Sequence, residues 1–567
     1  MSDFNGLRVA LSGLLAQRRG LEVTSHNIAN ARTPGYSRQS LDLRSVSGST
    51  VPAFFSKFPG GGFGVRVEDV VRARDMFLET RSYDEHGENA LLTAQKAALG
   101  QIELLFGEPS DSGIQHQLSD FWAGWDDLAN DPGNSAVRSQ LVQRGATVAG
   151  SIQKAASQIG ALRDGAIEQM TTVISQVNVL TKSIAQLNQA IQDSSVSGFE
   201  HNDLLDQRDQ AIAKLGELVK ISIRPADNEM VNVFTDGGNL VSEGMYDTLK
   251  IDASDMNIAV RFGKDSLVSN QTTGQLGGLL LVTNGIFPQY GTLLDGVAAS
   301  LRDQVNALHG YNGGSLVSAI PVSAQDQTGA TLSFKVRSDG GAWATVDVTG
   351  DDWSGDDGAS TLEATLNNQL SGAGASVAAT VTGGNGTPLQ VTFASIPSGG
   401  VVEATEVGKA PSQNAGYGLF MADVPLGSDR IGGRAFFVGT SAATLAVDSS
   451  LAANPSRIAA SRATGSALDA SVALQFARLG EGATSPDTSY RSFIAGLGVD
   501  TQTAARRLDI QSASMGNTDQ ARDAAAGVNI DEEMVSMVQY QQAYQASARM
   551  MNAINEALQT LLDLAGR

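Results

Sequence analysis

Cysteine is absent from all 567 residues of this chain. Disulfide bonds, thiolate catalysis and cysteine-ligated metals are therefore excluded, and the redox state of the compartment does not affect the fold. Histidine is almost as scarce, and its five residues never fall at the spacing of a zinc site: His26, His86, His116, His201 and His309. The sequence predicts no metal site and no cofactor.

Positive charge is also in short supply. The chain has 39 Lys and Arg residues against 60 Asp and Glu residues, a formal net charge of −21, and it contains no basic cluster. Because phosphate binding requires a basic face, nucleic acid is not expected as a partner. The sequence also lacks a cleavable signal pattern and an apolar run of about 20 residues, so we expect no membrane contact and, if the chain leaves the cell, another export route.

Enzyme motifs are missing as well. The chain contains neither GxSxG nor HExxH, and the glycine run at 60–64 is not followed by the Lys of a phosphate-binding loop. The acidic stretch 351–358 lacks the ligand spacing and final Glu of an EF-hand, which favours a solvated turn. A Ser-His-Asp arrangement stays open, but a protein without catalytic activity is the favoured interpretation.

The most informative segment that is present runs from Asn27 to Arg38. A helical pattern continues to Asn30, and the next residues, Thr33-Pro34-Gly35-Tyr36, predict a turn. Pro34 presets φ, and Gly35 tolerates a positive φ. The chain is therefore expected to leave a helix through a stiff, defined corner.

The first thirty residues carry an apolar row with helical spacing. Steps of three and four, with polar members at Arg18 and Ser25, place these side chains on one face of a helix about 40 Å long. The row consists of Leu7, Leu11, Leu14, Leu21 and Ile28. It predicts a coiled-coil helix.

A matching row lies at the far end of the chain, with polar members at Gln541 and Asn555. Asn529 is expected to cap this helix, and the anions at Asp531 and Glu532 suit the positive end of its dipole. The row consists of Met534, Met537, Tyr544, Met551, Leu558 and Leu562. Two matched terminal rows predict an assembly interface, although a single amphipathic helix in isolation more often packs on its own domain.

Between the ends, helical and strand patterns alternate. Helices are expected over 88–106, 114–128, 136–195 (as one or two long helices) and 278–309. A further helix is expected to begin with Asn202 as its cap. Phe121, Trp122 and Trp125 are expected in the core. Short alternating runs indicate strands in two insertions. We predict a multidomain α+β fold: a discontinuous helical body, terminal coiled-coil helices and inserted β-rich outer domains. The expected parts are 1–35 with 527–567 (terminal helical domain); 36–218 with 275–312 and 436–526 (mainly helical body); 219–274 (small β-rich insertion); and 313–435 (outer β-rich insertion).

Four segments resemble the bacterial flagellar axial proteins, and within them the hook-associated protein 1 branch: 27–38, 120–138, 202–209 and 527–549. A weaker match spans 274–311, whereas the β-rich insertions match little. The family motif positions are Asn27, Asn30, Pro34, Gly35, Tyr36, Asn529, Asp531 and Glu532.

The resemblance implies a structural subunit at the junction between hook and filament in the extracellular flagellum. It implies secretion through the flagellar type III export channel as an unfolded chain, followed by self-assembly with the terminal helices in an inner tube. The implied partners are copies of the chain, hook protein, the second junction protein and an export chaperone. Two rival hypotheses stay open: a hook or distal-rod protein, and a secreted adhesin that uses the Gly-, Ser- and Thr-rich stretch 313–435.

Overall fold

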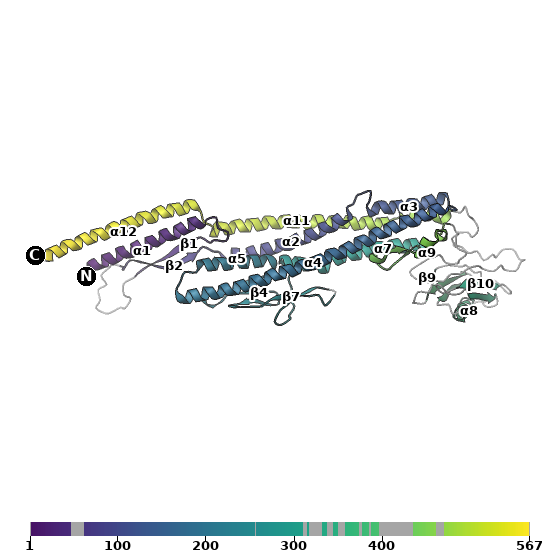
Figure 1. Cartoon of the computed structure of the whole chain (residues 1–567), viewed down its shortest axis with the longest axis horizontal. Helices are drawn as coiled ribbons and strands as arrows, with labels where there is room; N and C mark the ends of the chain where they lie inside the picture. The colour runs from purple at the N-terminus through teal and green to yellow at the C-terminus, as the bar shows by residue number, and fades with distance from the viewer. Residues whose placement is uncertain are drawn as a thin grey trace. The chain divides into compact units, whose positions relative to one another are not determined.

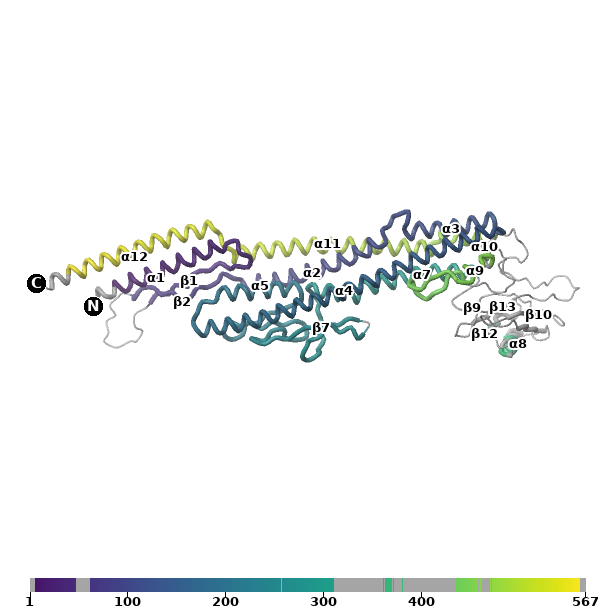
Figure 2. The backbone as a smooth tube through the Cα atoms, in the orientation of Figure 1, coloured from purple at the N-terminus to yellow at the C-terminus, as the bar shows by residue number. Residues whose placement is uncertain are grey.

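The computed structural model of the chain is drawn as a cartoon in Figure 1 and as a backbone tube in Figure 2. It describes residues 2–46, 62–255, 257–309, 315–316, 331–336, 344–349, 358–372, 377–384, 387–395, 435–460 and 470–565. The chain divides into two compact units. The first unit comprises Met1–Ala98, Gly165–Gly285 and Thr503–Arg567, and the second comprises Leu99–Asp164 and Ile286–Gln502.

The terminal helices belong to the first unit and lie side by side (Figure 1). They are α1 (Ser2–Asn30) and α12 (Ile530–Ala565). An antiparallel hairpin of β1 (Gln39–Ser45) and β2 (Val65–Arg72) follows α1, with an irregularity in register between Asp42 and Leu43. The sequence analysis did not anticipate this hairpin, although β2 begins with valines that alternate with charged residues.

Long helices make up most of the remaining helical part. They are α2 (Met76–Phe106), α4 (Ser135–Ser197), α5 (Asn202–Leu218), α6 (Gly274–Leu281) and α11 (Pro486–Ala526). A π-helical turn, η2 (Val282–Ile286), follows α6. The segment expected to form one or two helices over 136–195 is one helix of 63 residues. Helix α2 begins at Met76, twelve residues before the start that was expected at residue 88.

A small β insertion packs on α4 within the first unit. Its four-stranded antiparallel sheet has the order β3 (Ser222–Pro225), β4 (Val231–Thr235), β5 (Gly238–Ser242) and β6 (Met245–Tyr246), and β7 (Leu249–Asp252) pairs with β8 (Ala259–Phe262). The Asn178 side chain of α4 exchanges hydrogen bonds with the backbone of Leu249, at 3.0 and 2.7 Å. These bonds fix the insertion to the helix.

The second unit has an aromatic core between α3 (Ile114–Asn130), α7 (Phe287–His309) and α10 (Ser471–Leu479). Trp125 is fully buried and stacks on Phe476 with ring centroids 3.9 Å apart. Phe121 and Phe436 lie against the same indole ring, at 6.1 and 5.6 Å. The expectation that the aromatic residues of this segment belong to the core is confirmed.

Shorter elements complete the second unit. Near the aromatic core they are β14 (Phe437–Val438), β15 (Ala446–Val447) and α9 (Ser449–Ala453). Within the 313–435 stretch they are β9 (Ser315–Leu316), β10 (Thr331–Val336), β11 (Ala344–Thr349), α8 (Gly358–Gly372), β12 (Val377–Gly384) and β13 (Thr387–Ser395). There β10 pairs with β11, and β12–β13–β9 form a three-stranded sheet. The acidic stretch 351–358 lies almost entirely outside the described residues.

The predicted fold class is confirmed: a mostly helical α+β chain with long terminal helices and small sheets between them. The four-part domain division stays a prediction.

Candidate assembly site at the chain ends

The corner after α1 is a hydrogen-bonded turn. The Tyr36 amide donates to the Thr33 carbonyl at 3.2 Å, and Gly35 has φ +76°. Pro at the second position and a positive φ at the third define a type II turn, so the expected turn at this place is confirmed. The Gln210 side chain of α5 donates to the Pro34 carbonyl and holds the turn against the helix.

Asn27 is the most completely bonded side chain of the corner. It is 1% exposed, and its amide nitrogen donates to the Gln39 carbonyl at 2.8 Å and to Glu533 Oε2 at 3.0 Å. Its amide oxygen accepts from the Gln39 amide at 3.0 Å and from the Tyr36 hydroxyl at 2.8 Å. All four hydrogen-bonding positions of the side chain are therefore filled. This single side chain joins α1, the turn, β1 and α12.

Tyr36 and Asn30 support the same turn. The Tyr36 hydroxyl donates to Asn27 and accepts from Nδ1 of His26 at 2.9 Å. Burial, together with the negative charges of Asp206, Asp203 and Glu533, raises the pKa of Tyr36 above its ordinary value, so the hydroxyl stays protonated as a donor. The Asn30 side chain donates to the His26 carbonyl at 3.1 Å and accepts from the Thr33 hydroxyl at 3.1 Å.

Glu533 is the acidic counterpart of the corner on α12, and the sequence analysis did not select it. Its side chain is 3% exposed and accepts from Asn27 and from Nε of Arg38, the latter at 2.7 Å. The Arg38 amide donates to the Ala526 carbonyl at 2.8 Å, which connects the corner to the last turn of α11. Within the sequence, Glu533 is one of three acidic residues in the first turn of α12, a position that suits the helix dipole and does not point to a partner. Its partners Asn27 and Arg38 lie near the other end of the sequence.

The start of α12 agrees with the expected cap. The Asn529 side-chain oxygen accepts from the Asp531 amide at 3.0 Å, and Asn529 Nδ2 lies 3.5 Å from Glu532 Oε1. Glu532 also lies 3.4 Å from the Arg38 guanidinium, but its carboxylate is 60% exposed. The capping prediction is confirmed, and Asp531 and Glu532 act at the surface of the corner.

A network of buried charges lies beneath the corner, between β2 and α5. The Ser37 amide donates to Asp206 Oδ2 at 3.2 Å, and Arg72 donates to Asp206 at 2.7 Å and to Asp209 at 2.9 Å. Burial and the nearby charges of Arg72 and Arg74 lower the pKa of Arg208 to about 10. The segment 202–209 thus supports the corner from α5.

One capping prediction is wrong. The residue before α5 is His201, and Asn202 is the first helical residue. The Asn202 side chain instead donates to the Val70 carbonyl of β2 at 2.8 Å. Because a distant strand uses this side chain, it is not available to the first turn of its own helix.

Glycines on α1 face larger side chains on α12. A Cβ atom built on Gly6 would lie 3.3 Å from Ile554, one on Gly13 3.2 Å from Ser547, and one on Gly20 2.6 Å from Tyr540. The hydrogen bond between Asn27 and Glu533 continues the series. Successive positions are seven residues apart on both helices and run in opposite directions. The pair is therefore antiparallel with a heptad register, and small residues on α1 permit a close approach.

The predicted apolar rows do not supply these contacts. Leu7, Leu14 and Leu21 each follow one of these glycines by one residue, which is a rotation of about 100° around the helix. Leu11 is 45% exposed and Met534 is 53% exposed. The other members are half-buried, namely Leu7, Leu14, Leu21, Ile28, Met537, Tyr544, Met551 and Leu558, whereas the Leu562 side chain is outside the described part. The expectation of an assembly interface on these rows stays a prediction.

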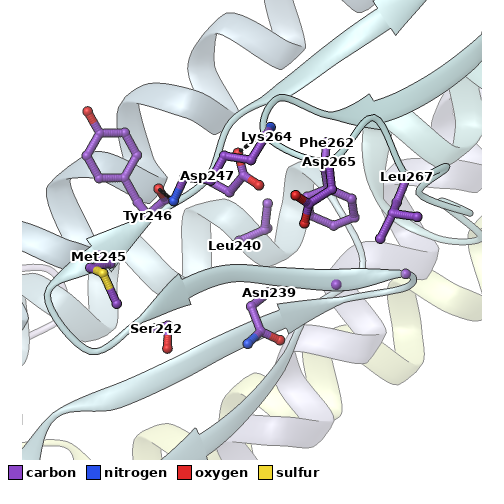
Figure 3. A pocket seen from close by; sticks show the side chains of 12 residues that line it. Asn239, Leu240, Ser242, Met245, Tyr246, Asp247, Phe262, Lys264, Asp265 and Leu267 are labelled. Atoms are coloured by element: carbon purple, nitrogen blue, oxygen red, sulfur yellow. Dashed lines mark hydrogen bonds between the residues drawn. The ribbon is translucent and has the colours of Figure 1, made fainter.

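A separate cleft of about 330 Å³ lies in the β insertion, between the β5–β6 hairpin and the turn after β8 (Figure 3). Phe262, Leu240 and Leu267 supply apolar lining, and Asp265 and Asn239 supply polar groups. The Lys264 ammonium donates to the Tyr246 carbonyl at 3.0 Å. This bond joins the turn after β8 to β6.

In the described part of the chain, no group of three or more His, Cys, Asp or Glu side chains is placed to hold a metal ion. Within the same ranges, no helix combines the length and apolar character that crossing a bilayer requires.

Three parts of the sequence match known protein families. Residues 99–314 match the helical domain of flagellar hook-associated protein FlgK. Residues 7–36, which contain most of α1 and the turn, match the flagella basal body rod protein family, and residues 519–564 match the C-terminal region of the flagellar basal body rod FlgEFG proteins. The resemblance to axial proteins at both chain ends is thereby confirmed.

Relatives named flagellar hook-associated protein 1 are similar over the full length. The protein from Bacillus subtilis is 26% identical over 574 residues, 100% of this chain and 99% of the relative; that from Escherichia coli is 25% identical, over 98% of each. A solved structure of the flagellar hook junction protein FlgK from Burkholderia pseudomallei is similar with a TM-score of 0.48 and 18% identity, covering 79% of this chain and 100% of that one. The chain therefore belongs to the family of flagellar hook-associated protein 1, a structural component of the flagellum.

Proposed function

We propose that the chain is a structural subunit of the hook-filament junction that assembles with copies of itself through its terminal helices. The full-length similarity to proteins named flagellar hook-associated protein 1 supports this assignment. The proposed neighbours are hook protein on one side and the second junction protein on the other. The proposed site of action is the extracellular flagellum, reached by type III export of the unfolded chain with a chaperone on its C-terminal helix.

The observation that carries the assembly proposal is apolar surface left on the terminal pair. Leu11 and Leu15 of α1 are 45% and 46% exposed, and Val535 and Val538 of α12 are 59% and 51% exposed. Burial of such side chains stabilises a contact by about 25 cal/mol per Å² of apolar surface. A second copy of the chain is the proposed partner of these exposed side chains. Neighbours in a helical assembly contact each other through two different faces, which suits one apolar surface on each terminal helix.

The composition suits the proposed export route. A chain without cysteine forms no disulfide that would have to be broken before it passes a narrow channel unfolded. In a single copy, apolar side chains of both terminal helices stay exposed, among them Leu11 and Val535. We expect limited proteolysis of the monomer to remove both ends before the middle. Protection of both termini in a verified monomer would contradict this expectation.

The function is tested by deletion and complementation in the source bacterium. Cells without the gene should build hooks but no filaments and should release flagellin into the medium. Normal filaments on the deletion strain would refute the junction assignment. Loss of attachment with intact filaments would favour an adhesin, and loss of the hook itself would favour a hook or rod protein.

The interface is tested by the double variant Leu11→Ser/Leu15→Ser. Its matched control is Leu104→Ser/Ile510→Ser, which changes two helical side chains that are 82% and 72% exposed and lie outside the terminal pair. The first variant should be secreted with unchanged helix content by circular dichroism, yet should not restore filaments. The control should restore them. Equal restoration by both variants would refute the assignment of the interface to this face of α1.

A further inference from the structure

The terminal pair has a repeating contact that does not by itself define one register. Gly6, Gly13 and Gly20 present gaps at equal intervals, and their partners on α12 follow at the same interval. If α12 moved by seven residues toward the corner, Ser547 would face Gly20 and Ile554 would face Gly13. A glycine has no side chain with which to distinguish these partners. The glycine positions therefore permit more than one alignment.

The fourth position of the series does distinguish them. Asn27 faces Glu533, which is 3% exposed and bonded to both Asn27 and Arg38. In the shifted alignment Tyr540 would replace Glu533 beside Asn27. The Asn27 amide would lose an acceptor, and the Glu533 carboxylate would lose both of its donors. Unpaired buried polar groups oppose such a shift strongly.

The connection between α11 and α12 at the corner also limits the register of the α1–α12 pair. The Arg38 amide donates to the Ala526 carbonyl at the end of α11, and α12 begins four residues later at Ile530. A shift toward the corner would unwind the first two turns of α12 and break the cap at Asn529. The same arginine therefore bonds the end of one helix and the first turn of the next.

We propose that Asn27, Glu533 and Arg38 set the register of the α1–α12 pair, whereas the glycines only allow the two helices to approach. A polar residue within an otherwise small or apolar contact is known to specify register in coiled coils. The inference concerns the free chain and goes beyond its proposed assembly. It makes the three residues positioning residues for every surface that α12 presents.

Two cysteine pairs report the two registers, and the absence of native cysteine makes each cross-link unambiguous. Gly13→Cys with Ser547→Cys reports the observed register, because a Cβ built on Gly13 lies 4.0 Å from the Ser547 Cβ. Disulfides form at Cβ separations of about 3.5–4.5 Å. Gly13→Cys with Ile554→Cys reports the register shifted by seven residues. Both pairs are oxidised in the full-length monomer under the same conditions.

The decisive variant is Glu533→Gln, and Glu532→Gln is its matched control. Both remove one carboxylate that faces Arg38, but Glu532 is largely exposed and does not bond Asn27. We expect the ratio of observed-register to shifted-register cross-linking rates to fall at least tenfold in Glu533→Gln and to stay unchanged in Glu532→Gln.

A second variant, Glu533→Leu, removes every hydrogen bond between residue 533 and Asn27. We expect the ratio of observed-register to shifted-register cross-linking rates to fall at least as far as in Glu533→Gln. If Glu533→Leu loses helix content by circular dichroism, the result with Glu533→Gln alone decides. An unchanged ratio in Glu533→Gln, or equal falls in both single Gln variants, would overturn the proposal.

Discussion

Gly20→Ala is the most direct test of the close contact between α1 and α12. A Cβ atom at position 20 would lie 2.6, 2.7 and 2.8 Å from three ring atoms of Tyr540. Carbon atoms in contact are normally separated by about 3.5–4.0 Å. Because three atoms of a planar ring are too close at once, the whole ring or the helix that carries it must move.

Two opposing effects determine the magnitude. Alanine is favoured over glycine within a helix by about 1 kcal/mol, whereas overpacking of a tight contact costs about 1–3 kcal/mol. Gly165→Ala in α4 isolates the first effect, since Gly165 is exposed and a Cβ there meets nothing within 4 Å. The two variants should therefore differ by about 1–3 kcal/mol, the overpacking term alone.

Hydrogen exchange is the suitable assay, because a chain with two units need not unfold in one step. We expect amides of α1 to exchange at least as fast in Gly20→Ala as in the unchanged chain, and amides around position 165 to exchange about fivefold more slowly in Gly165→Ala. Adding Tyr540→Ala to Gly20→Ala should remove the penalty, which a double-mutant cycle measures. Slower exchange of α1 in Gly20→Ala, by as much as in the control, would refute the close contact.

Three further outcomes are expected. Gly35→Ala forces a side chain into φ +76° and places its Cβ against the Gln210 side chain, so it should destabilise the corner by about 1–2 kcal/mol. Hydrogen exchange should become faster over residues 27–39 only, and unchanged exchange there would contradict the strain. The buried Asn306 side chain hydrogen-bonds to the Phe436 and Phe437 amides and to the Phe437 carbonyl. Asn306→Leu should therefore lower the thermal midpoint of the second unit by roughly 5–10 °C, measured by tryptophan fluorescence. A midpoint within one or two degrees of the original would show that these groups find other partners. Alkaline titration of tyrosinate absorbance should show a delayed class, because burial raises the pKa of Tyr83 to about 12 and also raises those of Tyr36, Tyr290 and Tyr490. Tyrosines of the unfolded chain ionise near pH 10, so the stability contributed by Tyr83 is complete below that pH and is lost as the pH rises through about 12. Titration of all tyrosines together near pH 10 would contradict their burial.

Local features of the chain were predictable from the sequence. The turn at Thr33–Tyr36 depends on the φ preferences of Pro34 and Gly35, and the cap of α12 depends on Asn529 and the two residues after it. Such features need only a few neighbouring residues. The β1–β2 hairpin escaped prediction because its strands are stabilised by α1 and α5 rather than by their own apolar pattern, as the bond from Asn202 to Val70 illustrates.

The sequence by itself determined two long terminal helices, the corner between α1 and the body, and the family to which those ends are similar. It did not determine which face of α1 meets α12. Apolar periodicity drew attention to the leucines, but the closest contact between two helices needs residues without bulk, and Gly6, Gly13 and Gly20 provide it. Only the tertiary structure decided the alignment, because Asn27 and Glu533 are 506 residues apart in the sequence and become partners only when the two ends of the chain fold together.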